Sequence, residues 1–409
     1  MTRRSFLAAT ATTAALASAG LDKISAADNP SSAEEKTNGL RPVLTGRPVI
    51  SGPAPDALSI LQPLAGTATG FLEFSVNGGS FQRVDSENDG LMPFEQHVLK
   101  FRLPPLPPGN EVRYRVKARA ITWVPVDQFV HGKIVSSELE TGKDRTFRTL
   151  DPGAGETRFV VWNDTHENSE TLRSLEKLTV AHRPDFLLWN GDQTNDLHFE
   201  SDMGGQLLTP AGVELASAWP LAYVRGNHDT RGPAAHKLHS FTGTPDDRYY
   251  YGFRSGPLAA LVMDTGEDKP DDNPLYAGLA AFARLRERQT KWLTEVVREP
   301  WFREAPFRVL FCHIPLWWLR EHPGEYSKAC REAWSPALIA AGVKVIISGH
   351  THQYAWLPAG TNQAIGQLVG GGPRPPIATY IEGTATRGRL TLTMQNLDGT
   401  IVEKIEIKA

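Results

Sequence analysis

The order of apolar and polar positions divides the chain into two regions. From about Leu40 to Leu150, short apolar stretches alternate with turn residues, as in all-β domains. Asn77-Gly78 lies between two apolar stretches and predicts a β-hairpin. In residues 112–118, apolar and charged side chains alternate strictly, as in a strand with one buried face. The first region is therefore predicted to be a small all-β domain over residues 40–150.

A second region begins after the Pro- and Gly-rich segment 150–156. Continuous apolar runs, typical of strands buried on both faces, are found at residues 159–162, 186–189 and 343–347. Helical patterns cover residues 169–181 and 280–297, and β patterns return from Ile377 to the end. The alternation of strands and helices predicts an α/β domain over residues 157–409.

Residues 1–27 have the pattern of an export signal. Arg3-Arg4 is followed by Phe6-Leu7 and by a weakly apolar run, and small residues offer cleavage points after Ala19 or near Ala27. This start resembles a twin-arginine signal, which implies transport by the twin-arginine machinery to the periplasm or the extracellular space. The alternative is a short terminal segment in which the paired arginines occur by chance.

Composition removes several classes of function. The 409 residues are enough for two domains, and a net charge of −3 gives no electrostatic basis for extensive nucleic-acid or membrane binding. No segment after the signal has the apolar length of a membrane span, so the mature protein is expected to be soluble. Cys312 and Cys330 are too few for a disulfide scaffold, and the sequence leaves open whether they pair.

Five polar clusters in the second region each follow an apolar, strand-like run: Asp164-Thr165-His166, Gly191-Asp192, Gly226-Asn227-His228-Asp229, His313 and Gly349-His350-Thr351-His352. In open α/β sheets, ligands gather beyond the carboxyl ends of the strands, so the clusters can meet in one crevice. Carboxylate, imidazole and amide oxygen are ligands that Fe, Mn and Zn accept. Each cluster alone is more often a turn, but the five together predict a metal site.

These clusters form the motif set of the calcineurin-like metallophosphoesterases, and the resemblance covers residues 158–353. Gln289 with Trp292-Leu293, and Ile314-Pro315 after His313, are also common in that family. The first region resembles the fibronectin-like sandwich that precedes the catalytic domain of purple acid phosphatases. The resemblance implies an α/β fold with a two-sheet core flanked by helices (αββα), preceded by a small all-β sandwich.

Carried over by position, the resemblance implies a centre of two divalent or trivalent metal ions, Fe, Mn or Zn. The implied ligands are Asp164, His166 and His352 for one ion and Asn227, His313 and His350 for the other. Asp192 is expected to bridge the two ions. The implied reaction is the hydrolysis of a small phosphate mono- or diester by a metal-bridging hydroxide.

Two further residues are implied to act in catalysis. His228 is expected to face the phosphate and assist the leaving group, with Asp229 orienting it. Two alternatives stay open: a nuclease or pyrophosphatase on the same site, and an exported binding module whose metal centre is vestigial. The complete set of ligands argues against the vestigial alternative.

One position departs from the purple acid phosphatases. Those enzymes have a tyrosine ligand three residues after the bridging aspartate, and Asn195 stands there in this sequence. Their first cluster is also usually Asp-x-Gly, whereas Asp164 is followed by Thr165-His166. We therefore expect no tyrosinate-ligated iron and no visible charge-transfer band from one.

Several residues near the clusters have two possible uses. Arg225 could touch the substrate phosphate or form a surface salt bridge, and Asp264 could support the ligands or end a strand in a turn. Trp317-Trp318 and His322 could form a lip over the crevice or pack against the domain. Gly370-Gly371-Gly372 is expected to let the backbone come close to the site.

Overall fold

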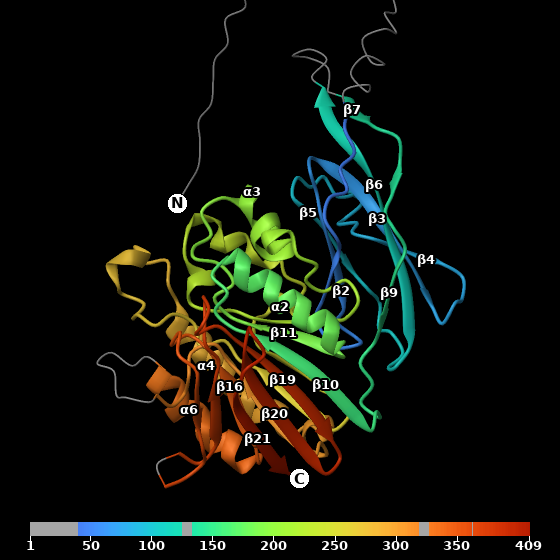
Figure 1. The fold of residues 1–409 in the computed structure, drawn as a ribbon. Helices are drawn as coiled ribbons and strands as arrows, with labels where there is room; N and C mark the ends of the chain where they lie inside the picture. The colour runs from blue at the N-terminus through green and yellow to red at the C-terminus, as the bar shows by residue number, and fades with distance from the viewer. Residues whose placement is uncertain (1–39, 125–132, 319–326, 362) are drawn as a thin grey trace, which may run out of the picture.

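The computed structural model of the protein describes residues 40–124, 133–318, 327–361 and 363–409. Within these ranges, two β-sheets pack face to face, and helices cover their outer sides (Figure 1). A second, all-β lobe, drawn in blue and cyan, lies beside this core (Figure 1). The predicted α/β class with a preceding β-sandwich is confirmed.

The larger sheet has nine strands in the order β21-β20-β19-β10-β11-β12-β1-β2-β5. Their bounds are β1 Val49–Ser51, β2 Ser59–Pro63, β5 Val98–Arg102, β10 Glu156–Trp162, β11 Phe186–Asn190, β12 Leu221–Val224, β19 Thr379–Thr386, β20 Arg389–Asn396 and β21 Ile401–Lys408. β10, β11 and β12 are parallel, and β11 and β12 are buried throughout, which explains their continuous apolar sequences. β19, β20 and β21 add antiparallel strands beside β10, so the C-terminal β patterns complete this sheet.

The second sheet of the core has six strands in the order β13-β14-β15-β16-β18-β17. Their bounds are β13 Tyr251–Ser255, β14 Leu258–Val262, β15 Phe307–Phe311, β16 Val345–Ser348, β17 Ala355–Leu357 and β18 Gly366–Val369. Aromatic rings fill the space between the two sheets. Phe159 stacks on Phe186 with ring centroids 5.3 Å apart, and Phe311 of the second sheet meets Phe159 edge-on at 5.9 Å. Such offset and edge-on pairs strengthen a core beyond the area that they bury.

Helices cover the outer face of each sheet. Their bounds are α2 Ser169–His182, α3 Glu200–Met203, α4 Phe282–Val296, α5 Pro300–Arg303 and α6 Ser327–Ala340, with short helical turns η1 Gly204–Leu208, η2 Pro210–Gly212, η3 His228–Thr230, η4 Pro233–Ser240, η5 Pro245–Asp247 and η6 Pro274–Tyr276. The Asn168 side chain caps α2 by accepting from the backbone amide of Thr171. Leu172 and Leu175 of α2 pack on the larger sheet, and Leu293 of α4 packs on the smaller one. Helices are therefore present where the sequence predicts them.

The N-terminal lobe is a sandwich that shares a sheet with the catalytic core. Its own sheet contains β3 Ala68–Val76, β4 Gln82–Asp85, β6 Glu111–Val124 and β7 Lys133–Ser136, with β8 Glu140–Thr141 and β9 Arg145–Arg148 also paired to β6. The predicted hairpin joins β3 and β4 at Asn77-Gly78. The opposite layer is β1, β2 and β5, and β1 pairs with β12 at Ser51 and Leu221. The nine-stranded sheet is therefore continuous across both lobes.

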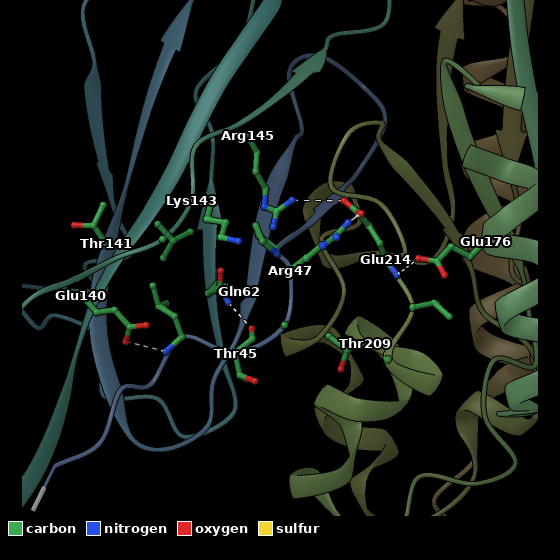
Figure 2. Close-up of a pocket in the computed structure, with 17 residues that line it drawn as sticks. Thr45, Arg47, Gln62, Glu140, Thr141, Lys143, Arg145, Glu176, Thr209 and Glu214 are labelled. Carbon is green, nitrogen blue, oxygen red and sulfur yellow. Dashed lines mark hydrogen bonds and ion pairs between the residues drawn. The ribbon is translucent and has the colours of Figure 1, made fainter. Parts of the chain in front are cut away.

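A cavity of about 740 Å³ lies where the two lobes meet (Figure 2). We call it the junction cavity; Arg47 and Arg145 from the sandwich side meet Glu214 from the catalytic side there (Figure 2). Nearby, the buried Tyr114 hydroxyl donates to the Ser217 carbonyl at 3.0 Å. None of the predicted site residues lines this cavity.

Two remaining sequence features concern cysteines and membranes. Cys312 and Cys330 are both buried free thiols. Among the described residues, no helix is both long and apolar enough to cross a bilayer. The predicted export signal, residues 1–27, lies outside the described residues. His322 also lies outside them.

Candidate metal centre

The predicted ligands lie on loops at the carboxyl ends of five strands. β10, β11 and β12 of the larger sheet are followed by the clusters at Asp164, Asp192 and Asn227. In the second sheet, β15 is followed by His313 and β16 by the segment 349–352. The parallel strands of each sheet present their carboxyl ends at one edge, so loops from both sheets converge there.

The structure brings all seven predicted ligands together in two groups. In the first group, the ligand atoms of Asp164, His166, Asp192 and His352 lie within 4.8 Å of one another. In the second group, those of Asp192, His313 and His350 do the same. Asn227 joins the second group, because its Oδ1 lies 2.8 Å from His350 Nδ1. Asp192 is the one residue common to both.

The imidazole nitrogens in the centre contact one another, carboxylates, or amide and carbonyl oxygens. His166 Nε2 lies 2.9 Å from His352 Nε2, a distance at which at least one nitrogen must lack a proton. The Nδ1 of His313 donates to the Asn190 carbonyl at 2.9 Å, which fixes this tautomer and leaves Nε2 toward the centre. That Nε2 is buried 3.1 Å from Asp192 Oδ2 but is not aligned for a hydrogen bond. Imidazole Nε2 atoms that face the centre without an aligned hydrogen-bond partner suit the coordination of a metal ion.

Burial and crowding of charge change the protonation of the cluster. Burial raises the pKa of Asp164 to about 8, with a further contribution from the neighbouring Asp192 carboxylate. Burial alone would lower the pKa of His313, but Asp192 and Asp164 raise it to about 10. Burial alone would raise the pKa of Asp192, but the neighbouring His313, His228 and His166 together hold it below its usual range. Without a cation, protons thus compensate the buried carboxylates, and a metal ion can replace them.

Five of the seven predicted ligands have left-handed backbone conformations. Their positive φ angles are 45° at Asp164, 42° at His166, 50° at Asp192, 69° at His350 and 54° at His352. Residues other than glycine rarely adopt this conformation, and such strain persists where the surrounding structure imposes it. Neither helical nor strand periodicity encodes this feature. The strain lies in the loops that aim these side chains at the centre.

The glycines beside the ligands keep space for them. A Cβ at Gly191 would collide with the ring of His313, and one at Gly226 would collide with Asp192. A Cβ at Gly349 would meet the Asp164 carboxylate, and one at Gly372 would meet the Asp164 backbone. These positions therefore admit the close approach of backbone and ligand that the sequence predicts.

The cluster is closed on one side and open on the other. Asp164 and His313 are fully buried and Asp192 is 1% exposed, whereas the His352 side chain is 43% exposed. The ring of Trp318 lies edge-on to His350, with centroids 5.6 Å apart. A substrate would therefore enter from the side of His352.

The environment of His228 differs in one respect from the sequence-based expectation. His228 lies beside the centre, with its ring centroid 4.8 Å from that of His166. However, both Asp229 oxygens accept from backbone amides, those of Gly226 and Asp192 on one oxygen and that of Thr194 on the other. Asp229 therefore does not orient the His228 ring in this structure. A buried carboxylate that accepts from three backbone amides is held in place by them. Asp229 therefore links two ligand loops and does not hydrogen-bond the His228 ring.

The His228 ring has two other partners. Its Nδ1 lies 2.6 Å from the Asn195 carbonyl oxygen, and Arg231 Nη1 lies 3.1 Å from its Nε2. The Asn195 side chain also reaches the first ligand group, with Oδ1 3.2 Å from His166 Nδ1. The position that holds a tyrosine in purple acid phosphatases thus supports two histidines here.

Two other side chains near the ligands have buried structural contacts. Arg225 donates to the fully buried Asp264 and lies over the Tyr249 ring, 4.3 Å from its centroid. Its pair is therefore not the surface salt bridge that the sequence allows. Gln289 of α4 accepts from the Asp264 amide at 2.8 Å and donates to the Asp264 carbonyl at 2.7 Å. These contacts fix the end of β14 behind the centre.

Sequence reasoning missed one charged pair beside the site. Arg231 Nε and Nη2 donate to the two oxygens of Glu267 at 2.9 and 2.7 Å. Glu267 is fully buried, although it lies on a loop. The position of Arg231, four residues after Asn227, is the local signal that could have drawn attention to it.

Part of the chain matches a known protein family. Residues 157–354 match the family model for calcineurin-like phosphoesterases. Residues 157–354 are therefore similar to the calcineurin-like phosphoesterases. This similarity implies a dinuclear metal centre, for which the two donor groups sharing Asp192 are the candidate.

Several curated relatives match this chain in part. The human serine/threonine-protein phosphatase CPPED1 is 31% identical over 158 residues, which are 37% of this chain and 46% of the relative. Purple acid phosphatase 22 of Arabidopsis thaliana is 24% identical over 227 residues, 52% of this chain and 48% of the relative. The chain therefore spans about half the length of these curated relatives.

A solved structure shares the fold of both lobes. The purple acid phosphatase PPD1 from yellow lupin (Lupinus luteus) seeds superposes with a TM-score of 0.63 at 14% identity. The match covers 88% of this chain and 74% of the lupin chain, a share that residues 157–409 alone could not supply. The likeness thus concerns the two-lobed fold.

Proposed function

We propose that the protein hydrolyses phosphate mono- or diesters with two metal ions. The observation that carries the proposal is the convergence of seven donors in two groups that share Asp192. Their mixture of carboxylate, imidazole and amide oxygen suits Fe, Mn or Zn. In this proposal, Asp164, His166 and His352 hold one ion, and Asn227, His313 and His350 hold the other.

The chain's own residues have distinct parts in this proposal. When bound, the metal pair would supply Lewis acidity and an activated water molecule. His228, held through Nδ1 by the Asn195 carbonyl, presents Nε2 beside the centre and assists the departing oxygen. Asp229 keeps the Asp192 and Gly226 loops in register through their amides. The left-handed loop conformations hold the ligands before substrate arrives.

A substrate panel tests the proposal. Purified protein is loaded with Mn, Zn or Fe and assayed with nitrophenyl phosphate, bis-nitrophenyl phosphate, nucleotides and cyclic nucleotides. Asp192→Asn serves as the blank, because it weakens both donor groups at once. We expect hydrolysis of at least one ester that depends on metal and is lost in the blank. The absence of hydrolysis with every metal would reject the proposal.

The alternatives give different results when nucleic acid and pyrophosphate are added to the same panel. A nuclease or pyrophosphatase would cleave nucleic acid or pyrophosphate and leave the small esters intact. A binding module with a vestigial centre would take up no metal on reconstitution, as elemental analysis would show. The complete donor set supports the hydrolase over the binding module, since all seven positions are filled.

We also propose roles for the parts of the chain outside the metal centre. The N-terminal lobe is proposed to be a fibronectin-like sandwich that stabilises its neighbour, an idea that the shared sheet supports. Residues 1–27, with Arg3-Arg4, are proposed to direct export by the twin-arginine machinery. Fusion of residues 1–27 to a reporter, with Lys replacing both arginines as the control, tests the export proposal. Export of both fusions, or of neither, would reject it.

A further inference from the structure

Arg231 is fixed beside the metal centre by an acidic clamp. It follows η3, and its Nε and Nη2 donate to Glu267 at 2.9 and 2.7 Å. A second acid, Asp268, accepts from Nη2 at 3.3 Å. Burial raises the pKa of the Glu267 carboxyl, but the hydrogen bonds from Arg231 bring it down to about 2. The guanidinium plane is therefore held by two adjacent carboxylates, those of Glu267 and Asp268.

One edge of the guanidinium faces an imidazole instead of a carboxylate. Nη1 contacts no carboxylate among the described residues, and its neighbours are His228 Nε2 at 3.1 Å and His228 Nδ1 at 3.4 Å. The Nδ1 of His228 is already directed at the Asn195 carbonyl. The Nη1 edge of Arg231 thus lies along the imidazole of His228, whose ring borders the first ligand group, 4.8 Å from the His166 ring.

We propose that Arg231 binds an anionic oxygen of the substrate phosphate and makes the site prefer monoesters to diesters. The inference rests on the proposed phosphoesterase function and names its substrate class. A phosphomonoester has one more anionic oxygen than a diester, in which an alkyl or aryl group occupies that position. Arginine provides directed, charge-assisted hydrogen bonds to such an oxygen, which a second ester group cannot accept equally well.

The surrounding charges make this a short-range preference. Arg231 and Lys269 are positive, whereas Glu267 and Asp268 are negative, and the four form a connected network. Because the formal charges cancel, the cluster has no large field that would attract every anion. Discrimination between monoesters and diesters then depends on the hydrogen bonds that Arg231 Nη1 makes at contact distance.

The experiment compares two esters in Arg231 variants loaded with Mn²⁺. For Arg231→Gln, we expect kcat/KM for nitrophenyl phosphate to fall by about 10- to 100-fold, chiefly through KM, because a charge-assisted hydrogen bond is lost. For bis-nitrophenyl phosphate the fall is expected to stay below about threefold, since that bond is weak or absent. Arg288→Gln, an exposed arginine on α4, is the matched control and should change neither ester.

A second variant keeps the test valid if Arg231→Gln is unstable. The double variant Arg231→Gln/Glu267→Gln removes the buried carboxylate that would otherwise lose its partner. It should show the same loss of monoester preference. Arg231→Lys, which retains charge but not the clamp geometry, should fall between wild type and Arg231→Gln.

Binding of inorganic phosphate provides a readout that is separate from turnover. Calorimetry should show at least about tenfold weaker phosphate binding in Arg231→Gln and in the double variant. Equal losses on both esters, or unchanged phosphate affinity, would overturn the inference and leave Arg231 as a tie between η3 and the Glu267 loop. If wild type hydrolyses no ester, the phosphoesterase proposal fails, and phosphate affinity alone then decides the role of Arg231.

Discussion

The metal centre and the junction cavity are both polar, but their charged groups differ in how they are satisfied. In the junction cavity, the Glu140 carboxylate accepts from two backbone amides, Glu176 accepts from another, and Glu214 meets Arg47 and Arg145. In the metal centre, by contrast, donor atoms of like kind face one another, as His166 Nε2 faces His352 Nε2. A ligand site is therefore recognised by converging, unsatisfied donors and not by the volume of a cavity.

The largest expected effect is the loss of activity when a glycine beside the metal centre, but not one beside the junction cavity, is changed to alanine. Gly191 and Gly212 both have positive φ, at 84° and 73°, but only at Gly191 would a Cβ collide, with the His313 ring. Gly191→Ala is expected to lose metal binding and at least about hundredfold in activity, because displaced ligands spoil the geometry. Gly212→Ala, beside the junction cavity, should cost only about 1 kcal/mol of backbone strain.

Activity, metal content and thermal unfolding of the two alanine variants measure this contrast. A Gly212→Ala protein with lost activity would show that the junction cavity, and not only the metal centre, determines catalysis. An active, metal-replete Gly191→Ala protein would contradict the close packing of His313 on Gly191.

A second prediction concerns the leaving group. His228→Ala is expected to lower turnover of alkyl phosphates by about hundredfold, as removal of a general acid does. Nitrophenyl esters should lose less, because their leaving group departs without protonation. His239→Ala, at an exposed histidine of η4, is the matched control. Steady-state kinetics on both ester types decides, and equal losses on them would count against this role of His228.

A third prediction concerns protons and metal uptake. Burial raises the pKa of Asp164 to about 8, and Asp192 and Asp164 raise that of His313 to about 10 against the effect of burial. Both groups hold protons near neutral pH and must release them to bind a cation. Metal affinity should therefore rise from about pH 6 to about pH 8, by about tenfold per unit for each proton released.

Calorimetric titration with Mn²⁺ or Zn²⁺ in buffers of different ionisation enthalpy measures the released protons. Metal affinity that is independent of pH would contradict the protonated, metal-free cluster. No comparable proton release is expected from the junction cavity, whose carboxylates already have donors.

The smallest expected effect lies at the contact between the lobes. Tyr114→Phe removes the buried hydrogen bond from the tyrosine hydroxyl to the Ser217 carbonyl. We expect a decrease of about 1 kcal/mol in the free energy of unfolding, with kcat and KM unchanged. Urea denaturation and kinetics on the same preparation test this. A large loss of activity would mean that the position of the sandwich affects the metal centre.

Patterns along the chain were sufficient for the local elements and for the identity of the donors. The apolar run 159–162 lies in β10, the helical pattern 169–181 corresponds to α2, and Asn77-Gly78 joins β3 to β4. The ligand clusters could be found because each follows a strand, and strand periodicity is visible in a short window of sequence. Side-chain chemistry then indicated a metal site before any distance was known.

Tertiary structure decided the relations between distant residues. The pairing of Ser51 with Leu221 joins two lobes that composition separates, and the contacts of Asp229 are to backbone amides instead of the histidine next to it. The clamp of Glu267 on Arg231 is of the same kind. Hydrogen bonds between residues far apart in sequence depend on how loops pack, and no local periodicity encodes them. The sequence by itself therefore determined which donors the metal centre has, whereas folding decided how they are held and what lies beside them.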